Sequence, residues 1–322
     1  MTSPLLAEGV AEVQRAAESG VVVVDRSTRS VVRVPGPDRL GWLHSLTSQH
    51  LSALAPWAPT EALVLDPHGR VEHHLQVVDD GEQTWLDGEP GTGEALVGFL
   101  ERMRFLLRVE PVEDTAATAV VSLVGPQSAR VAGEAFGADL GDGRGAAPLS
   151  GGGVARRVAW PVPGSVDLLL PRDRLAAALD AATAAGARPA GTWAFEALRV
   201  AARRPRLGRE TDHKTIPHEV GWLESAVHLE KGCYRGQETV ARVHNLGRPP
   251  RRLVLLHLDG SDDVLPAHGD PVTSGGRTVG QVGTAARHHE LGPVALAVVK
   301  RATPDDAVLE AGGVAARIDP GD

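Results

Sequence analysis

Cys233, the one cysteine among the 322 residues, is the residue whose type and neighbours point most directly to chemistry. A single thiol can close no internal disulfide and, alone, builds no thiolate metal site, so it is either buried filler or a thiol kept for its reactivity. Buried cysteines usually lie in apolar runs, whereas this one lies between Gly232 and Gly236, with Lys231 and Arg235 close by. These neighbours predict a turn at a surface or a cleft.

The charges around Cys233 leave its reactivity open. The thiolate is the reactive form, and nearby cations such as Lys231 and Arg235 raise its share. Glu230 and Glu238 act in the opposite sense, so the sequence does not fix the direction of a pKa shift. A functional thiol and a purely structural turn are both retained as interpretations.

The 13 histidines supply candidate bases and candidate metal ligands. His218 and His228 precede Cys233 and are candidates for its base, although a Cys–His pair depends on closeness in space. The doublets His73-His74 and His288-His289 suggest a metal, but neighbours on a strand point to opposite faces, so all four are expected to be exposed to solvent. Because the sequence contains neither H-E-x-x-H nor a cysteine cluster, no metal site is predicted.

Other charged residues give weaker indications. The arginine clusters at 203–206 and 248–252 suit carboxylates or phosphates, but a solvated basic surface is the preferred interpretation. A carboxylate can accept two adjacent N–H groups of a flat heterocycle, and Asp167, Glu196 and Glu219 are the candidates for that role. The sequence has no P-loop and no G-x-G-x-x-G after a strand, so a nucleotide-binding loop is not predicted.

Length and charge limit the class of protein. A chain of 322 residues predicts about two domains of about 150 residues each, with three small ones as an alternative. Its 33 basic and 41 acidic residues give a net charge of −8, which argues against general binding to nucleic acids or anionic membranes. The sequence shows no membrane-length apolar run, no secretion signal over Met1–Gly20 and no disulfide framework, so a cytoplasmic protein is expected.

The first third of the chain alternates strand-like and helix-like stretches. The β-branched runs at 21–24 and 31–34, joined by a polar turn, predict a hairpin. A helix is predicted from Arg39 onward. Turn residues separate the next strand-like runs, which predicts a three-stranded antiparallel meander over 62–65, 71–78 and 83–86. A helix over 93–104 and a strand over 105–109 are expected to follow.

The middle of the chain repeats the strand-to-helix pattern. The expected elements are a strand over 118–124, a helix over 127–136, paired strands over 154–160 and 166–170, and a helix over 172–184. Thr192 is predicted to cap a helix over 194–202.

The pattern changes near the end. Short strand-like runs at 253–258, 279–282 and 294–299 are separated by glycine, proline and aspartate turns, without a long helix. This pattern is typical of a small closed or nearly closed antiparallel barrel. A domain boundary is expected over Gly247–Pro250, because that segment cannot continue regular structure.

Taken together, the motifs resemble one protein family. Lys231–Arg242, which reads K-G-C-Y-R-G-Q-E-T-V-A-R, resembles the signature K-G-C-[FY]-T-G-Q-E-x-x-A-R of the YgfZ-type folate-binding proteins. Three further stretches, Glu196–Gly208 with Ile216–Glu219, Leu46–Gln49 and Leu65–Arg70, are similar to that family's other conserved pieces. The chain departs from the pattern twice: Arg203 replaces a glycine, and Arg235 replaces the threonine after the aromatic residue.

The resemblance implies a fold, because the family is similar to the T-protein of the glycine cleavage system. The implied fold is α+β, with two interleaved antiparallel-sheet α+β domains plus a C-terminal β-barrel, in a T-protein-like ring of three domains around a folate site. The predicted domains are residues 1–50 with 115–195, residues 51–114 with 196–246, and residues 247–322.

The resemblance also implies a role: tetrahydrofolate-dependent support of iron–sulfur enzymes, including radical enzymes that modify tRNA. Cys233 would be the functional thiol, and Asp167 falls roughly where T-proteins hold the pterin with a carboxylate. Iron–sulfur client proteins are the expected partners of a monomer that binds neither nucleic acid nor membrane. The predicted folate-binding residues are Asp167, Glu219, Lys231, Tyr234, Gln237, Glu238 and Arg242.

Two other functions are retained. The shared fold allows an aminomethyltransferase that passes a one-carbon unit to tetrahydrofolate, although T-proteins do not carry the cysteine motif. A non-catalytic scaffold is the third interpretation. The preferred hypothesis requires an exposed Cys233 thiol beside a cavity that admits a reduced pteridine.

Overall fold

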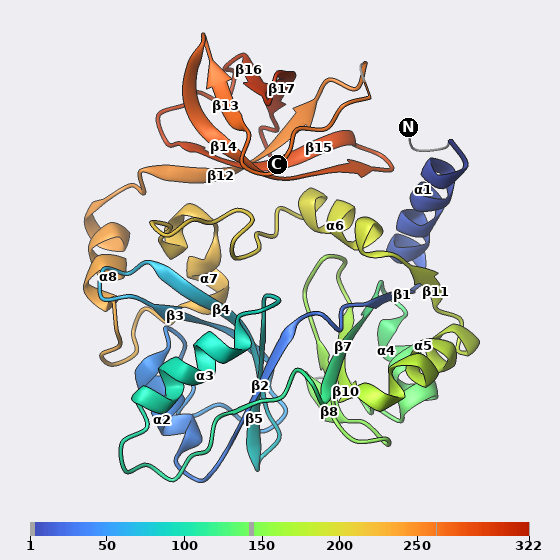
Figure 1. Cartoon of the computed structure of the whole chain (residues 1–322), viewed down its shortest axis with the longest axis vertical. Helices are drawn as coiled ribbons and strands as arrows, with labels where there is room; N and C mark the ends of the chain where they lie inside the picture. The colour runs from blue at the N-terminus through green and yellow to red at the C-terminus, as the bar shows by residue number, and fades with distance from the viewer. Residues whose placement is uncertain (1–3, 142–144, 262, 322) are drawn as a thin grey trace.

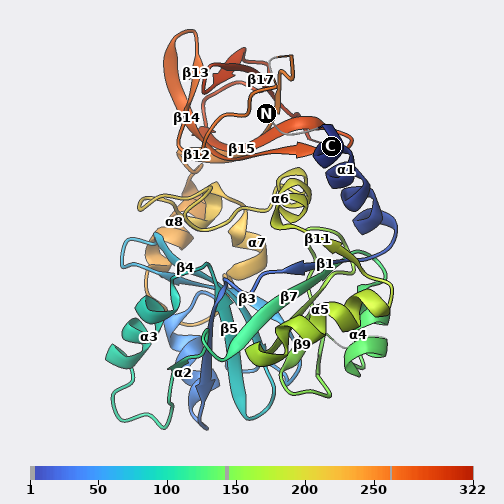
Figure 2. The same ribbon diagram turned by 45° about the vertical axis from the view of Figure 1, so that its right-hand side comes forward.

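The computed structural model describes residues 4–141, 145–261 and 263–321, and these residues form two open sheets and one closed barrel. The outermost residues of the predicted domains, 1–3 and 322, lie outside the described residues. In Figure 1 the barrel lies above the two sheets, and helices α6 (Thr192–Ala201) and α7 (Trp222–Ala226) lie between them. Figure 2 shows the same layering from a second direction. The α+β fold with a C-terminal barrel is therefore confirmed.

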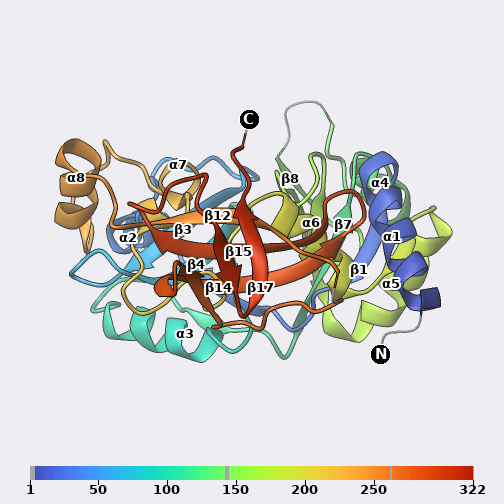
Figure 3. The same ribbon diagram turned by 90° about the horizontal axis from the view of Figure 1, so that it is seen from above.

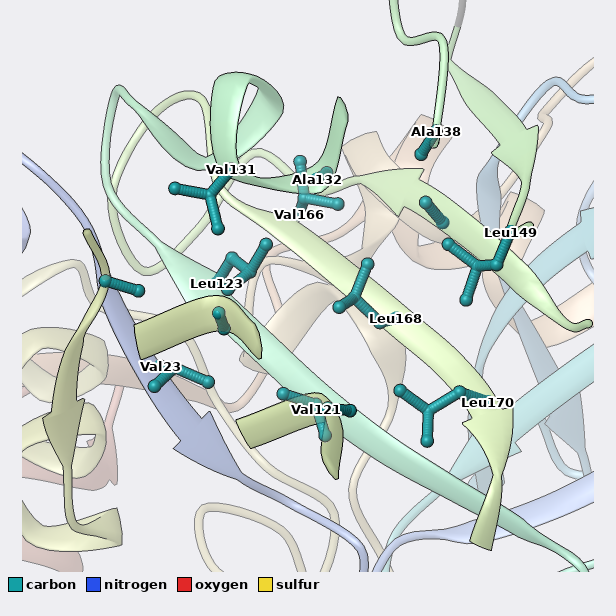
Figure 4. Packing of buried hydrophobic residues seen from close by; sticks show 14 of the residues in the cluster. Val23, Val121, Leu123, Val131, Ala132, Ala138, Leu149, Val166, Leu168 and Leu170 are labelled. Atoms are coloured by element: carbon teal, nitrogen blue, oxygen red, sulfur yellow. The ribbon is translucent and has the colours of Figure 1, made fainter. Parts of the chain in front are cut away.

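The first sheet has the strand order β11-β1-β7-β10-β9-β8. Alternate residues of its central strands face opposite sides: Val121 and Leu123 pack beneath helices α4 and α5 (Figure 4), while Val120 faces the second sheet. The elements are β1 (Val22–Asp25), β7 (Thr118–Val124), α4 (Ser128–Phe136), β8 (Ala146–Pro148), β9 (Val154–Arg157), β10 (Val166–Pro171), a 3-10 turn (Arg172–Arg174), α5 (Leu175–Ala184) and β11 (Arg188–Ala190).

The second sheet has the order β3-β4-β5-β2-β6. The predicted meander is confirmed, because β3, β4 and β5 pair in sequence and antiparallel. Helices α2 and α3 cover one face, where Trp42, Leu43 and Phe99 are buried. The elements are β2 (Ser30–Pro35), α2 (Arg39–Leu46), β3 (Thr60–Leu65), β4 (Val71–Asp79), β5 (Gln83–Gly88), α3 (Gly93–Arg102) and β6 (Val112–Glu113).

The barrel closes through the pairing of its first and last strands, with Leu256 opposite Ile318. The predicted barrel is therefore confirmed. On its outer face Leu255 and Leu296 pack against Ala197 and Val200 of α6, so this helix joins the barrel to the rest of the chain. Its strands are β12 (Arg251–Leu258), β13 (Pro271–Ser274), β14 (Arg277–His288), β15 (Gly292–Lys300), β16 (Leu309–Ala311) and β17 (Val314–Ile318).

The predicted hairpin over 21–24 and 31–34 is wrong. Strand β1 pairs with β7 and β11, whereas β2 pairs with β5 and β6 in the other sheet. The link between them therefore crosses from one sheet to the next, and residues 30–46, assigned by the sequence to the first domain, belong with the second sheet. The domain limits themselves stay a prediction.

Two local expectations also differ from the structure. Residues 105–109 form no strand, and Phe105 has the left-handed φ of 48°. Helix α6 begins at Thr192, and its cap is Gly191, so Thr192 is the first helical residue instead of the cap. Among the described residues, no helix is both long enough and apolar enough to cross a membrane.

Candidate functional site

The Cys233 side chain is exposed, in the turn between α7 and α8 (Gln237–Leu246). The turn is anchored by Lys231, whose buried Nζ donates hydrogen bonds to the carbonyl oxygens of His44, Thr47 (2.5 Å) and Gln49 (3.2 Å). These carbonyls lie at and just beyond the C-terminus of α2, where a cation is favourable. Burial lowers the pKa of Lys231 to about 8. The lysine of the motif is thus a structural anchor of the turn that carries the thiol.

A glycine–glycine contact fixes the other side of the turn. Gly236 has φ of 83°, and a Cβ there would lie 2.6 Å from the carbonyl oxygen of Asp66. Gly69 has φ of 77°, and a Cβ there would lie 2.8 Å from the Cβ of Thr239. Only glycine allows this approach. The structure therefore brings together two motifs, at 65–70 and 231–242, that the sequence shows far apart.

The remaining motif residues divide into builders of the turn and exposed side chains. Tyr234 is buried against Val71 and Trp222, with its ring centroid 4.9 Å from Lys231 Nζ, and Gln237 Nε2 donates to the Lys231 carbonyl at 3.4 Å. The side chains of Glu238 and Arg242 are exposed. Arg235, the departure from the family pattern, lies 3.1 Å from Glu72 and 5.5 Å from the centroid of the Phe99 ring.

Three histidines adjoin the Lys231 anchor. The ring centroids of His44 and His50 lie 4.7 Å apart, and those of His50 and His228 lie 5.1 Å apart. Burial and the charge of Lys231 lower the pKa of His44. His218, the other candidate base, lies in the 3-10 turn Pro217–Glu219, and neither of its buried ring nitrogens has a hydrogen-bond partner among the described residues. The roles of His218 and His228 as bases stay predictions.

Asp167 lies in a buried ion network between the two sheets. Its oxygens accept hydrogen bonds from Ser122 (2.5 Å) and Arg156 (3.1 Å), and Arg26 Nη1 lies 3.8 Å away. Arg156 also contacts Asp87. Burial alone would raise the pKa of Asp87, but its arginine neighbours lower it to about 2. The network ties β9 and β10 to the second sheet.

A cavity of about 490 Å³ lies where the first sheet, α6 and the barrel meet; we call it the junction cavity. Its wall is rich in guanidinium groups, with one acid and two aromatic rings: Arg26, Arg29, Arg206, Arg209, Glu196, Trp193 and Phe195. Trp193 is 73% exposed, which is unusual for a tryptophan without a partner. A cavity of this size fits a drug-sized ligand.

Two of these arginines lack a hydrogen-bonded carboxylate. Arg206 is held by Glu89 (2.6 Å) and Glu196 (2.8 Å). Among the described residues, no carboxylate lies within salt-bridge distance of Arg209. Arg26 donates a hydrogen bond to Ser122, and its guanidinium carbon lies 4.1 Å from the centroid of the Phe195 ring. Burial and the neighbouring Arg29 lower the pKa of Arg26 to about 10, so it stays charged at neutral pH. The cavity is therefore suited to an anionic, partly aromatic ligand.

The predicted site residues do not gather at one place. Asp167 lies behind the Arg26 wall of the junction cavity, while no residue of 231–242 contributes to that wall. Figures 1 and 3 show α8, which follows the Cys233 turn, and the first sheet on opposite flanks of the molecule. Glu219 is buried and holds Arg251 of the barrel through two hydrogen bonds of 2.8 Å. Its folate role, like those of the other predicted residues, stays a prediction.

Sequence reasoning missed Arg26, Arg29 and Arg156. Arg26 and Arg29 flank a short polar turn and Arg156 is the first of an arginine doublet, and such positions are a weak signal in an arginine-rich chain. The cluster at 203–206 was interpreted as solvated surface, yet Arg206 is paired and lines the junction cavity.

The expectation that His73 and His74 are exposed is wrong. His73 lies on the apolar face of β4 with Nδ1 buried and without a hydrogen-bond partner, and burial lowers its pKa to about 4. His74, on the other face, lies 3.0 Å from Glu61 and is stacked on Trp222 at a centroid distance of 4.4 Å. Burial would raise the pKa of Glu61, but hydrogen bonds from His74 and Ser225 lower it to about 2.

His73 predicts a loss of stability in acid. The pKa of His73 is about 4 in the native state and about 6.5 in the unfolded chain, so below pH 6.5 the unfolded chain binds a proton that the native state does not. The free energy of unfolding should therefore fall by about 2–3 kcal/mol as pH drops from about 6.5 to about 4. Urea unfolding of the wild type, His73→Gln and the exposed control His68→Gln across this range measures it. Equal acid slopes in all three proteins would contradict the prediction.

Comparisons with known proteins agree with this architecture. Residues 251–319 match the family model described as the glycine cleavage T-protein C-terminal barrel domain. The chain is 28% identical over 286 residues to an aminomethyltransferase of Thermus thermophilus, covering 87% of this chain and 79% of that protein. It is 27% identical over 280 residues to a chloroplastic protein of Arabidopsis thaliana named as a candidate transferase, covering 82% of this chain but only 62% of the relative's length.

A solved structure extends the agreement to the whole chain. The glycine cleavage system aminomethyltransferase T from Bartonella henselae superposes with a TM-score of 0.83 at 18% identity, covering 99% of this chain and 89% of that one. At this identity the likeness concerns the fold. The chain therefore has the fold of the T-protein-like aminomethyltransferase family, including that family's C-terminal barrel domain.

Proposed function

We propose that this protein binds a reduced folate such as tetrahydrofolate in the junction cavity and supports iron–sulfur client enzymes through the Cys233 thiol. The observation that carries the folate assignment is the pair of guanidinium groups, Arg26 and Arg209, that line one cavity without hydrogen-bonded carboxylates. Folate has two carboxylates on its glutamyl end and a flat pteridine at the other. Arginine forks suit the carboxylates, and Trp193 and Phe195 offer aromatic faces for the ring.

The thiol is proposed to act toward a protein partner. Cys233 is exposed, its turn is anchored by Lys231 and Gly236, and the motif contributes no residue to the wall of the junction cavity. A thiolate at a fixed surface position can ligate iron or exchange with a client's sulfur groups. The resemblance to the YgfZ-type signature favours iron–sulfur enzymes, including tRNA-modifying radical enzymes, as clients. A cytoplasmic location stays the expectation.

Calorimetry with tetrahydrofolate under anaerobic conditions tests the cavity. The wild type is expected to bind with saturable heat, and Arg209→Gln and Arg26→Gln to weaken binding by about 10–100-fold each, since a hydrogen bond to a charged group contributes about 1.5–3 kcal/mol. Arg277→Gln is the matched control, because Arg277 is an exposed arginine of the barrel outside the cavity.

Two outcomes would contradict the assignment. Absence of saturable heat with the wild type would favour the scaffold interpretation. Wild-type affinity in both cavity variants would place the folate elsewhere, for instance near the Cys233 turn.

The fold favours aminomethyl transfer as the second candidate function. Purified protein, an aminomethylated carrier protein and tetrahydrofolate form the decisive assay. Methylene transfer is not expected, since the T-proteins that catalyse it lack the cysteine motif. Rapid, enzyme-dependent methylene transfer would reverse this ranking.

A further inference from the structure

Helix α1 (Pro4–Ser19) holds the turn between β14 and β15 of the barrel. The Gln14 side chain is buried, its Nε2 donates to the Arg287 carbonyl at 3.0 Å, and its Oε1 accepts from the His289 backbone N–H at 2.9 Å. Both hydrogen bonds join the Gln14 side chain to backbone atoms of the turn, so they fix the position of the turn relative to the helix. Glu18 lies one helical turn further along the same face.

A cluster of three ligand-type side chains forms at this contact. Glu18 Oε2 lies 2.9 Å from His289 Nε2, and Glu18 Oε1 lies 3.9 Å from His288 Nε2. One ligand atom from each residue lies within 4.8 Å of the other two. The side chains of His288 and His289 are 6% and 3% exposed, whereas Glu18 is 38% exposed. The cluster is thus buried on the histidine side and open on the carboxylate side.

The side chains of His288 and His289 point toward the same place because strand β14 ends between them. His288 is the last residue of β14, and His289 is the first residue of the turn, so the alternation of side chains stops between them. Their rings lie 4.7 Å apart between centroids and are tilted by 35°. The expectation that these histidines are exposed and point apart is therefore wrong.

His289 supplies an independent indication of a ligand. Its Nε2 is buried and has no hydrogen-bond partner of acceptable geometry among the described residues, although a carboxylate oxygen lies 2.9 Å away. A buried ring nitrogen without a partner is costly unless something else occupies its lone pair.

We propose that Glu18, His288 and His289 form a binding site for a divalent transition metal ion of the zinc class. Two imidazoles and one carboxylate are a known zinc donor set, with a fourth position for water. Bond lengths of about 2.0–2.2 Å place neighbouring ligand atoms of a tetrahedral site about 3.4 Å apart. The ligand atoms of the three side chains lie within 4.8 Å of one another, and the two histidine nitrogens lie 2.9 and 3.9 Å from different oxygens of the Glu18 carboxylate. Side-chain rotations that draw these atoms together by about one ångström complete the site.

Metal binding requires a change of tautomer at His288. Without metal, its Nδ1 accepts from the backbone N–H groups of Glu290 and Leu291, both at 3.3 Å, so the proton of the neutral ring is on Nε2. A metal ion on Nε2 moves that proton to Nδ1 and turns the two amides toward water. Glu290 and Leu291 are exposed, so water can replace the lost acceptor.

A bound ion would fasten α1 to the barrel. These two elements are distant in sequence, and the unfolded chain does not hold the three ligands together. Binding to the native state alone raises stability by mass action. The site therefore predicts a thermal midpoint that rises with zinc concentration.

Zinc titration of the full-length, chelator-treated protein tests the site by calorimetry and by thermal unfolding. The wild type and Cys233→Ser are both measured, because the exposed thiol can bind zinc by itself. One ion per chain is expected at the site, with a raised thermal midpoint. His289→Gln and Glu18→Gln should each weaken binding by at least about 100-fold, since the loss of even an outer partner of a metal ligand weakens binding by roughly 10–100-fold.

His213→Gln is the matched control, since this histidine is exposed and lies outside the cluster. It should bind zinc like the wild type. Circular dichroism verifies that each variant is folded. Unchanged one-to-one binding in His289→Gln, or no binding by the Cys233→Ser protein below about millimolar zinc, would overturn the site and leave a Glu–His ion pair between α1 and the barrel.

Discussion

Replacing Arg156 by Leu is expected to lower the free energy of unfolding by about 3–5 kcal/mol. The side chain of Arg156 is 1% exposed and contacts two carboxylates, Asp87 and Asp167. Its removal leaves both carboxylates in the interior. Asp87 keeps its hydrogen bond from Arg29 at 2.6 Å, but the remaining arginine near Asp167 is Arg26, at the longer distance of 3.8 Å. An incompletely compensated buried charge is far more costly than a lost surface pair. Urea or guanidinium unfolding measures the loss.

Arg130→Ala is the matched control for this substitution. Arg130 lies 2.6 Å from Glu134 one helical turn away, but both side chains are largely exposed. Such a pair contributes about 0.3–0.5 kcal/mol. A loss below about 1 kcal/mol in Arg156→Leu would show that water reaches the network and screens it.

Replacing Cys233 by Ala is expected to abolish the support of iron–sulfur enzymes in cells while leaving the fold intact. The exposed thiol makes no packing contribution comparable to a buried side chain, so the change in stability should stay within about 0.5 kcal/mol. The measurement is the activity of an iron–sulfur enzyme in cells that lack their own copy of the gene and carry either the wild type or the variant.

Two controls make the thiol experiment specific. Cys233→Ser keeps the size and polarity of the side chain and should fail like the alanine variant, whereas Ser261→Ala, at an exposed position of the barrel, should behave like the wild type. Because the chain has one cysteine, a thiol reagent should modify the native wild type once. Full activity of Cys233→Ala would refute the functional thiol.

The two halves of the proposed function can be separated experimentally. The junction cavity and the Cys233 turn share no wall residues, so Cys233→Ala should retain tetrahydrofolate binding and Arg209→Gln should retain thiol reactivity. Loss of folate binding in Cys233→Ala would instead indicate that the folate binds next to the thiol, as the hypothesis from the sequence requires.

Local patterns predicted the elements that depend on local chemistry. The runs at 62–65, 71–78 and 83–86 formed the expected meander because each is joined to the next by a short turn. Strands β12, β14 and β15 of the barrel were predicted from the same rules, whereas the short strands β13, β16 and β17 were not. Strand β2 was assigned wrongly, because its partners β5 and β6 are chosen by packing across more than 40 residues of chain and not by the preceding turn.

Side-chain roles were harder to predict than elements. Glycines and charges around Cys233 correctly predicted an exposed turn. The burial of Lys231 was not predicted, because a lysine among charged residues is typical of a surface. In the structure its Nζ is buried and donates hydrogen bonds to carbonyl oxygens of residues 44–49. Its partners lie about 180 positions away, and no local pattern reports such a contact.

The sequence by itself therefore determined the order of most strands and helices, the barrel and the accessibility of the thiol, since these depend on periodicity, turn residues and immediate neighbours. Tertiary structure alone decided which sheet each strand joins, which arginines border the junction cavity and why His288 and His289 converge on Glu18. Those outcomes depend on burial and electrostatic pairing between distant segments, and such energies exist only once the chain has folded.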